Sequence, residues 1–409
     1  MASVPPHAWS SPVTEHDASI YAHIDSLDTL NKPVRLEQKL ATIHESLFAH
    51  MDFIDRISVA KYDPGTDELK TFLASSPGTN DLVRYEAKLA ETPSLLEVLR
   101  AGRPRVVQDL NLFHQGVHLH TKIIAREGYR FSYTSPMYLN GVFWGFIFFN
   151  SRTSDAPLDE NALRLLDVFS HLISALVTAE MLSVRILAAT IKTAQEMVHF
   201  RDPETGGHID RMARYARLIA QHLAATGVAP FDDEDIERIF EFAPLHDIGK
   251  IAIPDRILLK KGKLSPEERE EMKLHTLRGS EMIHNIASNF GLDHLDGLEL
   301  LEQIAASHHE AMDGSGYPRG LRGNEIPLEA RIIAVADVFD ALTSVRPYKP
   351  SWSNEEVFAW LRGLAHKQFD EDCVEALIFN AAKVKEIQKL FPDENLAPAP
   401  ESDAPPGNP

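Results

Sequence analysis

The sequence predicts an α+β domain joined by a long helix to an all-α domain, and three features of the chain support this prediction. Helical and strand-like segments are mixed between residues 35 and 157, whereas residues 158–200 contain neither Pro nor Gly. Beyond residue 200 the apolar residues recur at helical spacing, and no strand-like alternation of any length is present. A chain of 409 residues is also too long for one ordinary core, so we expect two or three domains.

The composition excludes several classes of protein. With 44% hydrophobic and 25% charged residues the chain is globular, and its net charge of −19 opposes binding to nucleic acid or to anionic lipid. Cys373 is the only cysteine, which rules out a disulfide framework or a thiolate-rich metal site. The N-terminus does not resemble a signal peptide, and the longest apolar run, residues 142–149, is too short to span a bilayer. We therefore expect a cytoplasmic protein that binds neither nucleic acid nor membrane.

The segment before residue 158 has the pattern of a small α+β domain. Residues 35–51 show helical spacing of apolar positions, and residues 57–63 and 68–75 are strand-like on either side of the turn signal PGTD. Further on, Asn140 and Gly141 separate two aromatic strand-like runs, which is a strong signal for a two-residue hairpin.

The segment 158–200 is predicted to be one continuous helix. Along it an apolar or small residue recurs every seven positions, at Leu165, Leu172, Ala179, Ile186 and Thr193. Phe169 and Leu176 flank this repeat, but Ser183 and Thr190 interrupt it. The helix either packs on its own domain or forms a dimeric signalling helix between the two domains.

These patterns divide the chain into five parts. In order, they are an N-terminal extension that is partly disordered (1–34), the α+β domain (35–180), a connecting helix (181–199), the all-α domain (200–391) and a disordered, Pro-rich tail (392–409). Within the all-α domain, Ser265 followed by Pro266 and Glu268 predicts a capped helix start.

Histidines and carboxylates gather in the all-α domain in a pattern typical of a metal site. They are Glu204, His208, His246, Asp247, His275, His308, His309 and Asp337. Imidazole suits first-row divalent metals and a carboxylate can bridge two ions, while adjacent His-Asp and His-His pairs can reach different ions of one cluster. Such a cluster would activate water against a phosphate ester, so the pattern by itself indicates a metallohydrolase.

Each of these residues also has a plainer interpretation. A single histidine on a helix is more often a packed or surface residue than a ligand. Asp337 has apolar neighbours in the sequence, which favours a ligand or a buried salt bridge, and Glu204 could be an ordinary acid in the first turn of a helix.

The motifs around these residues are more specific. The chain resembles the HD-GYP family of metal-dependent phosphohydrolases over residues 190–390, through RDPETGGH (201–208), HDIGKIAIPD (246–255), HTLRGSEMI (275–283), HHEAMDGSGYP (308–318) and VADVFDALTSVRPYK (335–349). The resemblance implies hydrolysis of the bacterial second messenger cyclic di-GMP to pGpG and/or GMP, with two or three iron or manganese ions as cofactors.

The resemblance also implies roles for individual residues. The metal ligands are His208, His246, Asp247, His275, His308, His309 and Asp337, with Glu204 making room for a third ion. Asp247 would bridge neighbouring ions, and Lys250, one turn beyond His246, would contact the scissile phosphate or its leaving oxygen.

Four residues are implied to bind the substrate: Lys250, Tyr317, Arg346 and Lys349. Arg346 and Lys349 suit phosphate and guanine contacts, although a basic pair at a helix end is the plainer alternative. Tyr317 could line the pocket, pack its own loop, or face a partner protein such as a diguanylate cyclase (GGDEF). Gly314 and Gly316 would give that loop a tight backbone path.

The α+β domain resembles a GAF sensor domain, more weakly in sequence, over residues 35–180. Its ligand is unknown, and a bilin attached through cysteine is excluded because Cys373 lies outside the domain. His114, His118 and His120 could bind a metal or haem but are more typical of a solvated loop. We expect a homodimer through the GAF-like domain and the connecting helix.

Two alternative functions remain open at this point. The substrate could be another cyclic dinucleotide such as cyclic GMP-AMP, or the chain could be a catalytically silent receptor that binds cyclic di-GMP and docks a partner. The intact set of ligand positions argues against a silent receptor. Nucleic-acid binding is opposed by the net charge.

Overall fold

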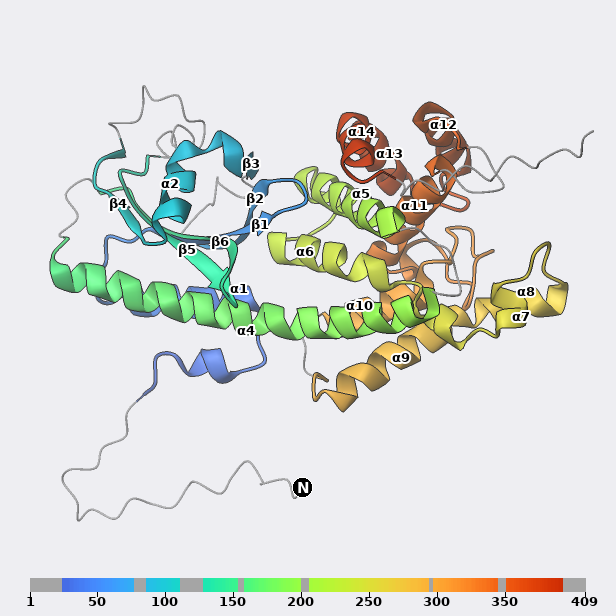
Figure 1. The fold of residues 1–409 in the computed structure, drawn as a ribbon, viewed down its shortest axis with the longest axis horizontal. Helices are drawn as coiled ribbons and strands as arrows, with labels where there is room; N and C mark the ends of the chain where they lie inside the picture. The colour runs from blue at the N-terminus through green and yellow to red at the C-terminus, as the bar shows by residue number, and fades with distance from the viewer. Residues whose placement is uncertain are drawn as a thin grey trace, which may run out of the picture.

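Figure 1 shows an elongated molecule whose two folded parts share one long helix. The computed structural model describes residues 24–76, 86–110, 128–153, 158–199, 206–293, 297–344 and 351–392. A six-stranded sheet with helices forms the N-terminal part, and a cluster of helices forms the C-terminal part. The predicted fold class, α+β followed by all-α, is confirmed.

The sheet has the strand order β3-β2-β1-β6-β5-β4, and all neighbouring strands are antiparallel. Its strands are β1 (Arg56–Asp63), β2 (Glu68–Ser75), β3 (Glu86–Lys88), β4 (Arg105–Val107), β5 (Phe131–Leu139) and β6 (Val142–Ser151). Both predicted hairpins are present, since β1 pairs with β2 and β5 pairs with β6 across Asn140 and Gly141. The β1–β2 hairpin points toward the C-terminal part (Figure 1).

Alternate residues of the strands fill two apolar layers, one on each face of the sheet. On one face, Ile147 and Phe149 pack with α1 (Leu36–Phe48) and with the first half of α4 (Glu160–His199). On the other face, Phe146 and Phe148 pack with α2 (Pro93–Ala101). Two short 3-10 turns, η1 (Asp28–Asn31) and η2 (Leu89–Glu91), complete this part.

The C-terminal part is helical throughout its described residues. Its helices are α5 (Gly206–Ala225), α6 (Asp233–Phe242), α7 (Asp255–Leu258), α8 (Pro266–Lys273), α9 (His275–Asn289), α10 (Leu298–Ser307), α11 (Leu328–Thr343), α12 (Asn354–Leu364), α13 (Glu371–Phe379) and α14 (Ala381–Leu390), with 3-10 turns η4 (Ala243–Leu245), η5 (Ile248–Ala252) and η6 (Gly323–Glu325). Helix α5 is central, because Met212, Tyr215 and Ile219 are fully buried. The predicted cap of α8 is present, with Ser265 and Glu268 forming a reciprocal capping box.

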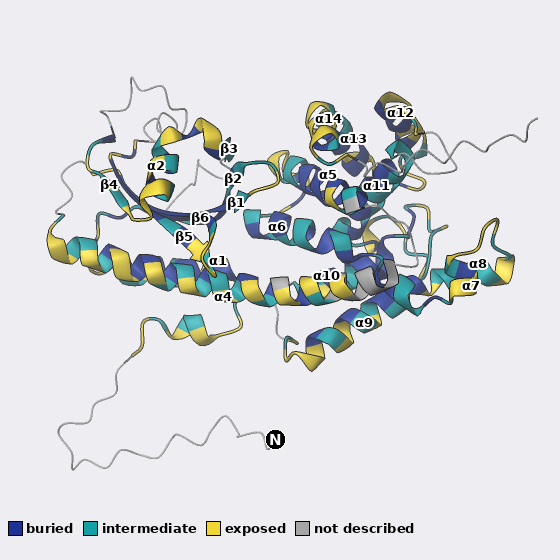
Figure 2. Ribbon diagram, in the orientation of Figure 1, coloured by how far each residue is buried: buried dark blue, intermediate teal, exposed yellow. Residues whose placement is uncertain are grey.

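Helix α4 is continuous, as predicted, and one of its faces contributes to both cores. Leu166, Ile173 and Val177 belong to the core of the sheet, whereas Val184 and Leu187 belong to the core of the C-terminal part. Buried and exposed residues alternate along the part of the helix that is coloured in Figure 2. The helix is therefore a structural element of both domains and not a free linker.

The heptad repeat lies beside the buried face of α4: Leu165 and Leu172 are partly buried against the core of the sheet, whereas Ala179, Ile186 and Thr193 are exposed. None of Leu165, Leu172, Ala179, Ile186 and Thr193 is buried, but the flanking Phe169 turns into the core of the sheet. The exposed residues of the repeat share their face of the helix with Val168, Ala175, Leu182 and Ala189. The resulting apolar stripe has regular spacings of three and four residues, and Ser183 and Thr190 lie beside it.

Part of α4 is also long and apolar enough to cross a membrane. The segment Glu160–Val184 has a mean hydropathy of 1.5, and it is the one segment among the described residues that meets this criterion of length and composition. Because 33% of the segment is buried within the chain, its apolar character also serves the core of the sheet.

Buried ion pairs join the sheet to the helical part. The Nζ of Lys61 on β1 lies 3.0 Å from Glu237 and 2.6 Å from Glu241, both on α6, and the Nε of Arg217 on α5 lies 3.4 Å from Glu237. Burial by itself raises the pKa of Glu237, but the charges of Arg217 and Lys61 outweigh it and lower that pKa to about 2. The carboxylate is thus held ionised between two cations.

A second set of contacts ties the end of β1 to α5. The carboxylate of Asp63 lies 3.2 Å from Arg214 and 3.5 Å from Arg217. Burial raises the pKa of Asp63, yet Arg217 and Arg214 together lower it below its ordinary value. Gln221, further along α5, donates a 2.6 Å hydrogen bond to Glu86 on β3.

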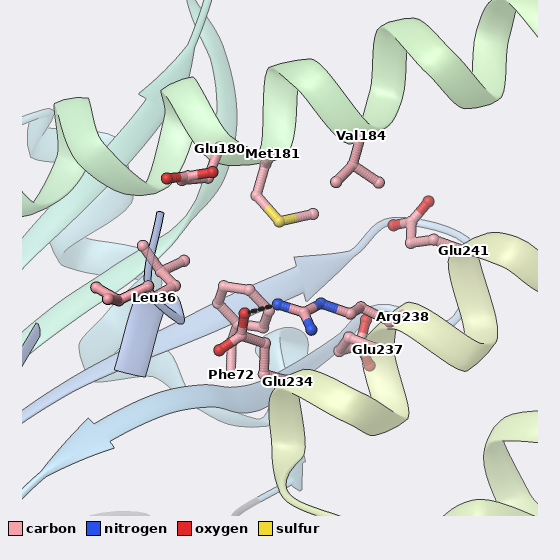
Figure 3. A pocket seen from close by; sticks show the side chains of 10 residues that line it. Leu36, Phe72, Glu180, Met181, Val184, Glu234, Glu237, Arg238 and Glu241 are labelled. Carbon is pink, nitrogen blue, oxygen red and sulfur yellow. Dashed lines mark hydrogen bonds and ion pairs between the residues drawn. The ribbon is translucent and has the colours of Figure 1, made fainter. Parts of the chain in front are cut away.

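A cavity lies where the sheet, α4 and α6 meet (Figure 3). Its apolar lining includes Leu36, Phe72, Met181 and Val184, and its polar lining includes Glu180, Glu234, Glu237, Arg238 and Glu241. Each glutamate has a cationic partner: Glu180 pairs with Lys39, Glu234 with Arg238, and the other two with Lys61. The charges around the cavity are therefore balanced within the junction of the two domains.

Candidate metal centre

The predicted ligands come from five separate elements that meet inside the C-terminal part. His208 is on α5, and His246 and Asp247 lie between η4 and η5. The other ligands follow in sequence: His275 begins α9, His308 and His309 follow α10, and Asp337 is on α11. The fold thus brings together side chains that are up to 129 positions apart in the sequence.

Asp247 lies at the middle of this group. Its Oδ1 is 3.2 Å from the Nε2 of His275 and 3.6 Å from that of His308, and its Oδ2 is 3.3 Å from the Nε2 of His246. One ligand atom from each of Asp247, His275, His308 and His309 lies within 4.8 Å of the others. This spacing is compact enough for the four side chains to share one metal ion or a pair of ions.

The main chain fixes the orientation of three of the imidazole rings. The contacts are His246 Nδ1 to Ala243 O at 2.8 Å, His275 Nδ1 to Met272 O at 2.8 Å, and His308 Nδ1 to Ile304 O and Ala305 O at 3.1 Å. A carbonyl oxygen can only accept, so each Nδ1 carries a proton, which leaves each Nε2 as the ring atom that can bind a metal. This is the tautomer that a metal ligand requires.

Four atoms at the middle of the group are buried without a hydrogen-bond partner among the described residues: the Nε2 atoms of His246, His275 and His308, and the Oδ1 of Asp247. Burying a polar atom without a partner costs about 1–3 kcal/mol, and native proteins rarely leave several together. Three imidazole nitrogens and one carboxylate oxygen form a donor set suited to a divalent metal ion. The side chains present therefore fit metal ions well.

Electrostatics distinguish the members of the group. Burial raises the pKa of Asp247, but the charges of Lys250 and His246 outweigh it and hold that pKa well below its ordinary value. Burial, followed by the charge of His308, lowers the pKa of His309 to about 2. The centre thus holds an ionised carboxylate beside a neutral imidazole, and both are in the protonation state that binds a metal.

His208 and Asp337 form a neighbouring pair. The Nε2 of His208 lies 3.6 Å from the Oδ1 of Asp337. Burial lowers the pKa of His246, but the charge of Asp247, followed by that of Asp337, outweighs it and raises that pKa to about 9. The pair of His208 and Asp337 therefore lies at the edge of the same centre. Unlike the other rings, His208 is oriented by a side chain, since its Nδ1 lies 2.8 Å from the Oδ2 of Asp340.

Lys250 lies at the centre, as predicted. Its Nζ is 2.8 Å from the Oδ2 of Asp247, on the oxygen that also faces His246. The lysine side chain is 23% exposed, so its cation lies between the buried ligands and solvent.

The loop after His309 is folded around Glu310, a residue that the sequence analysis did not single out. Its buried carboxylate accepts hydrogen bonds from the backbone N–H groups of Arg319 (2.7 Å) and Leu321 (3.0 Å). Gly316 packs against the backbone at Glu310, where an added Cβ would come within 2.5 Å of main-chain atoms. The predicted tight path of the loop is thus observed, and its cause is this close packing.

Tyr317 lies beside the ligands. Its ring centroid is 4.8 Å from that of His309 and 6.4 Å from that of His275, and the Nζ of Lys273 lies 5.4 Å from the ring. Burial, followed by the charge of Asp247, raises the pKa of Tyr317, so its hydroxyl stays protonated. The loop therefore brings an aromatic side chain to the edge of the centre.

A glycine sets the distance between two of the ligand-bearing segments. Gly249, in η5, packs so closely on α9 that an added Cβ would lie 1.8 Å from the carbonyl oxygen of His275. No side chain fits there, because that oxygen belongs to the backbone. The close approach places His246 and Asp247 against His275.

Several predicted residues lie outside the part of the chain that the structure describes. They are Glu204, Arg346 and Lys349 of the predicted site, and His114, His118 and His120 of the N-terminal domain. Their predicted roles remain predictions.

Comparison with known protein families agrees with the fold and the site. Residues 35–177 match the GAF domain family, and residues 192–373 match the HD domain family. The chain carries a GAF domain followed by an HD domain. The strand order of the sheet belongs to the GAF domain, and all described members of the metal centre fall within the HD domain.

Curated relatives match about half of the chain. The chain is 41% identical over 209 residues to the cyclic di-GMP phosphodiesterase response regulator RpfG of Xanthomonas campestris pv. campestris, covering 51% of this chain and 52% of that protein. It is 41% identical over 198 residues to the cyclic di-GMP phosphodiesterase of Thermotoga maritima, covering 48% of this chain and 50% of that protein. The chain thus spans about half the length of the curated relatives that it matches.

A third relative has a different named substrate. Over 246 residues the chain is 35% identical to the 3'3'-cGAMP-specific phosphodiesterase 2 of Vibrio cholerae, covering 58% of this chain and 44% of that protein. Among solved structures, the phycocyanobilin-bound GAF domain of a cyanobacterial phytochrome aligns with 39% of this chain and 96% of its own, at 15% identity and a TM-score of 0.31. The GAF assignment accordingly rests on the family match and on the sheet itself.

Proposed function

We propose that the HD domain hydrolyses the phosphodiester bonds of cyclic di-GMP, giving pGpG and/or GMP. The observation that carries this proposal is the group of buried, unpartnered ligand atoms around Asp247, in a domain whose relatives are named cyclic di-GMP phosphodiesterases. The proposed HD-GYP domain extends over 200–391 and the proposed GAF-like domain over 35–180, joined by a connecting helix over 181–199.

The ligands proposed for two ions are His208, His246, Asp247, His275, His308, His309 and Asp337, with Glu204 joining if a third ion binds. Iron or manganese is the expected metal. When bound, such ions lower the pKa of water to near neutrality and offset the negative charge of a phosphate ester.

The chain itself supplies orientation and one further positive charge. Main-chain carbonyls hold three of the rings with Nε2 toward the centre, and the carboxylate of Asp247 would help to hold the ions there. Lys250 lies beside Asp247 and can neutralise charge that builds on the phosphate or on the leaving oxygen. Tyr317 provides a ring for a guanine base, and Arg346 with Lys349 is proposed to bind phosphate and guanine.

The test is to purify the protein without oxygen, quantify its metals, and separate the products formed from cyclic di-GMP by chromatography. We expect two or three ions per chain and formation of pGpG or GMP. His308→Ala and Asp247→Ala should each abolish both metal content and turnover. Hydrolysis at the wild-type rate in either variant would contradict the assignment of the site.

A second substrate is favoured by one observation, the match to a 3'3'-cGAMP-specific phosphodiesterase. The same assay with cyclic GMP-AMP separates the two possibilities through the ratio of kcat/KM values. A protein that binds metals and cyclic di-GMP but hydrolyses neither compound would instead be a receptor.

Regulation is proposed to come from the GAF domain through α4, in a homodimer. The apolar stripe of α4 supports this proposal, because Val168, Leu182 and Ile186 are 61%, 40% and 41% exposed and share one face. Alternating spacings of three and four residues are what a two-stranded coiled coil requires. A diguanylate cyclase (GGDEF) remains a proposed partner for the loop of Tyr317.

A further inference from the structure

One ligand of the metal centre is oriented by a buried carboxylate. Asp340, on α11, is fully buried, and its oxygens accept four hydrogen bonds. The donors are His208 Nδ1 (2.8 Å), Arg211 Nε (2.7 Å), Arg211 Nη2 (2.8 Å) and Ser344 Oγ (2.8 Å). Two of these bonds come from one guanidinium, which grips both carboxylate oxygens.

The fold holds the Asp340 carboxylate in place and keeps it ionised. A buried ionised carboxylate is costly unless it is paired and hydrogen-bonded, and here Arg211 meets both needs. The same arginine donates to the backbone oxygen of Phe391 (2.8 Å) and to Ser344 (2.7 Å). Arg211 thus ties α5 to α11 and to the residue after α14, which leaves Asp340 little freedom to move.

The contact with Asp340 fixes the orientation of the His208 ring. Because a carboxylate accepts, the Nδ1 of His208 carries the proton, and its Nε2 is directed toward Asp337 at 3.6 Å. The rings of His246, His275 and His308 receive the same orientation from carbonyl oxygens three or four residues earlier in their own segments. His208 instead depends on a side chain 132 positions away.

We propose that Asp340 is a positioning residue of the metal centre, which holds His208 so that its Nε2 can bind an ion beside Asp337, and that Arg211 holds Asp340 in place. This inference rests on the proposed function only in that the centre must bind metal. Outer partners of metal-binding histidines typically contribute about 10–100-fold in metal affinity. We therefore expect Asp340→Asn to weaken the binding of one ion by about that factor.

The experiment titrates metal-free protein with Mn²⁺ and measures the stoichiometry and affinity of each ion by calorimetry. Ser344→Ala is the matched control, since it removes the Ser344 hydrogen bonds to Asp340 and Arg211 but leaves the contact between Asp340 and His208 in place. We expect this control to bind Mn²⁺ within about 3-fold of the wild type, because an ordinary hydrogen bond contributes about 1 kcal/mol or less.

A double-mutant cycle separates positioning from a general loss of structure. If Asp340 acts through His208, Asp340→Asn has no further effect on Mn²⁺ affinity once His208→Ala is present. Because Asp340→Asn leaves Arg211 without its counter-charge, the cycle is also run with Arg211→Met and Asp340→Asn combined, which removes both charges. Thermal unfolding of the metal-free variants shows which of them retain the fold.

The outcomes are distinct. Wild-type Mn²⁺ affinity in a folded Asp340→Asn variant, or in the charge-free pair, overturns the proposal, as do effects of Asp340→Asn and His208→Ala that simply add. A wild-type protein that binds no Mn²⁺ overturns both this proposal and the proposed function. A wild-type protein that binds Mn²⁺ but cleaves no cyclic dinucleotide contradicts the proposed function alone.

Discussion

At the scale of single residues, the centre combines metal-binding side chains with the cationic side chain of Lys250. Lys250 is a poor ligand because its ammonium group has no lone pair, yet its Nζ lies 2.8 Å from Asp247. Its charge is the main cause of the low pKa of Asp247 after burial is overcome. A cation beside Asp247 keeps that carboxylate ionised, and it can also offset the negative charge of a bound phosphate.

Lys250→Met is therefore expected to lower kcat by about 10²–10³-fold while the protein keeps its metals. The prediction is checked by steady-state hydrolysis of cyclic di-GMP together with metal quantification of the same sample. Lys260→Met is a suitable control, since Lys260 pairs with Glu268 on α8, away from the ligands. An unchanged kcat in Lys250→Met would show that Lys250 is a surface lysine with no part in the reaction.

The residue scale also shows what sequence patterns can and cannot predict. Adjacent pairs such as His246-Asp247 and His308-His309 indicate a metal cluster because neighbouring ligands are rare by chance. Asp340 and Arg211 were missed, although each lies three residues after a predicted ligand. Their contact depends on how α5 packs against α11, and no local pattern encodes that packing.

At the scale of secondary-structure elements, helix α4 has two apolar faces with different roles. One face fills the cores of both domains, which explains why the helix needs apolar residues outside the heptad repeat. The other face carries the exposed Val168, Ala175, Leu182 and Ile186, while Leu165 and Leu172 of the repeat pack partly on the core of the sheet. Sequence periodicity predicted the helix and the repeat, but only the packing of Phe169 reveals which neighbouring positions complete the exposed stripe.

Replacing Leu182 and Ile186 together by Glu is expected to convert a dimer into a monomer, because charges would be buried at the centre of the interface. Light scattering coupled to size-exclusion chromatography should give twice 45.7 kDa for the wild type and 45.7 kDa for the variant. Phe379→Glu serves as the control, since Phe379 is exposed on α13. A wild type that stays monomeric and sediments with lipid vesicles would mean that the stripe meets a membrane instead.

At the scale of the whole molecule, the two domains are held by ion pairs between residues far apart in the sequence. Lys61 and Asp63 come from the GAF sheet, and their partners lie about 150–180 positions later. Each of these residues alone has the sequence character of a surface charge, so this interface could not be predicted. The order of the two domains could be predicted from the sequence, because each domain has its own motif and periodicity.

Glu237 is expected to make the stability of this junction dependent on pH. Because its folded-state pKa is about 2 and its ordinary value is 4.5, its contribution is complete above pH 4.5 and is lost as the pH falls toward 2. At neutral pH, Glu237→Gln should lower the unfolding free energy by about 3 kcal/mol, because the buried Lys61 and Arg217 lose a shared counter-charge and keep only Glu241 and Asp63. The difference in unfolding free energy between the variant and the wild type should become smaller below pH 4.5.

Thermal unfolding of both proteins from pH 7 to pH 3 measures this difference. Glu386→Gln is the matched control, because Glu386 also pairs across the domains, with Lys88, but is exposed and should contribute little. Equal melting temperatures for Glu237→Gln and the wild type at neutral pH would show that the pair does not stabilise the junction.

The contact at Gly249 has a consequence for judging related chains by their motifs. The backbones of two ligand-bearing segments touch there, so one added methyl group would push His246 and Asp247 away from His275 while leaving every ligand in the sequence. An inventory of ligands is then no proof of activity. A homologue can be silenced by a residue that has no chemistry of its own, and the glycine of such a motif should be inspected before its histidines are counted.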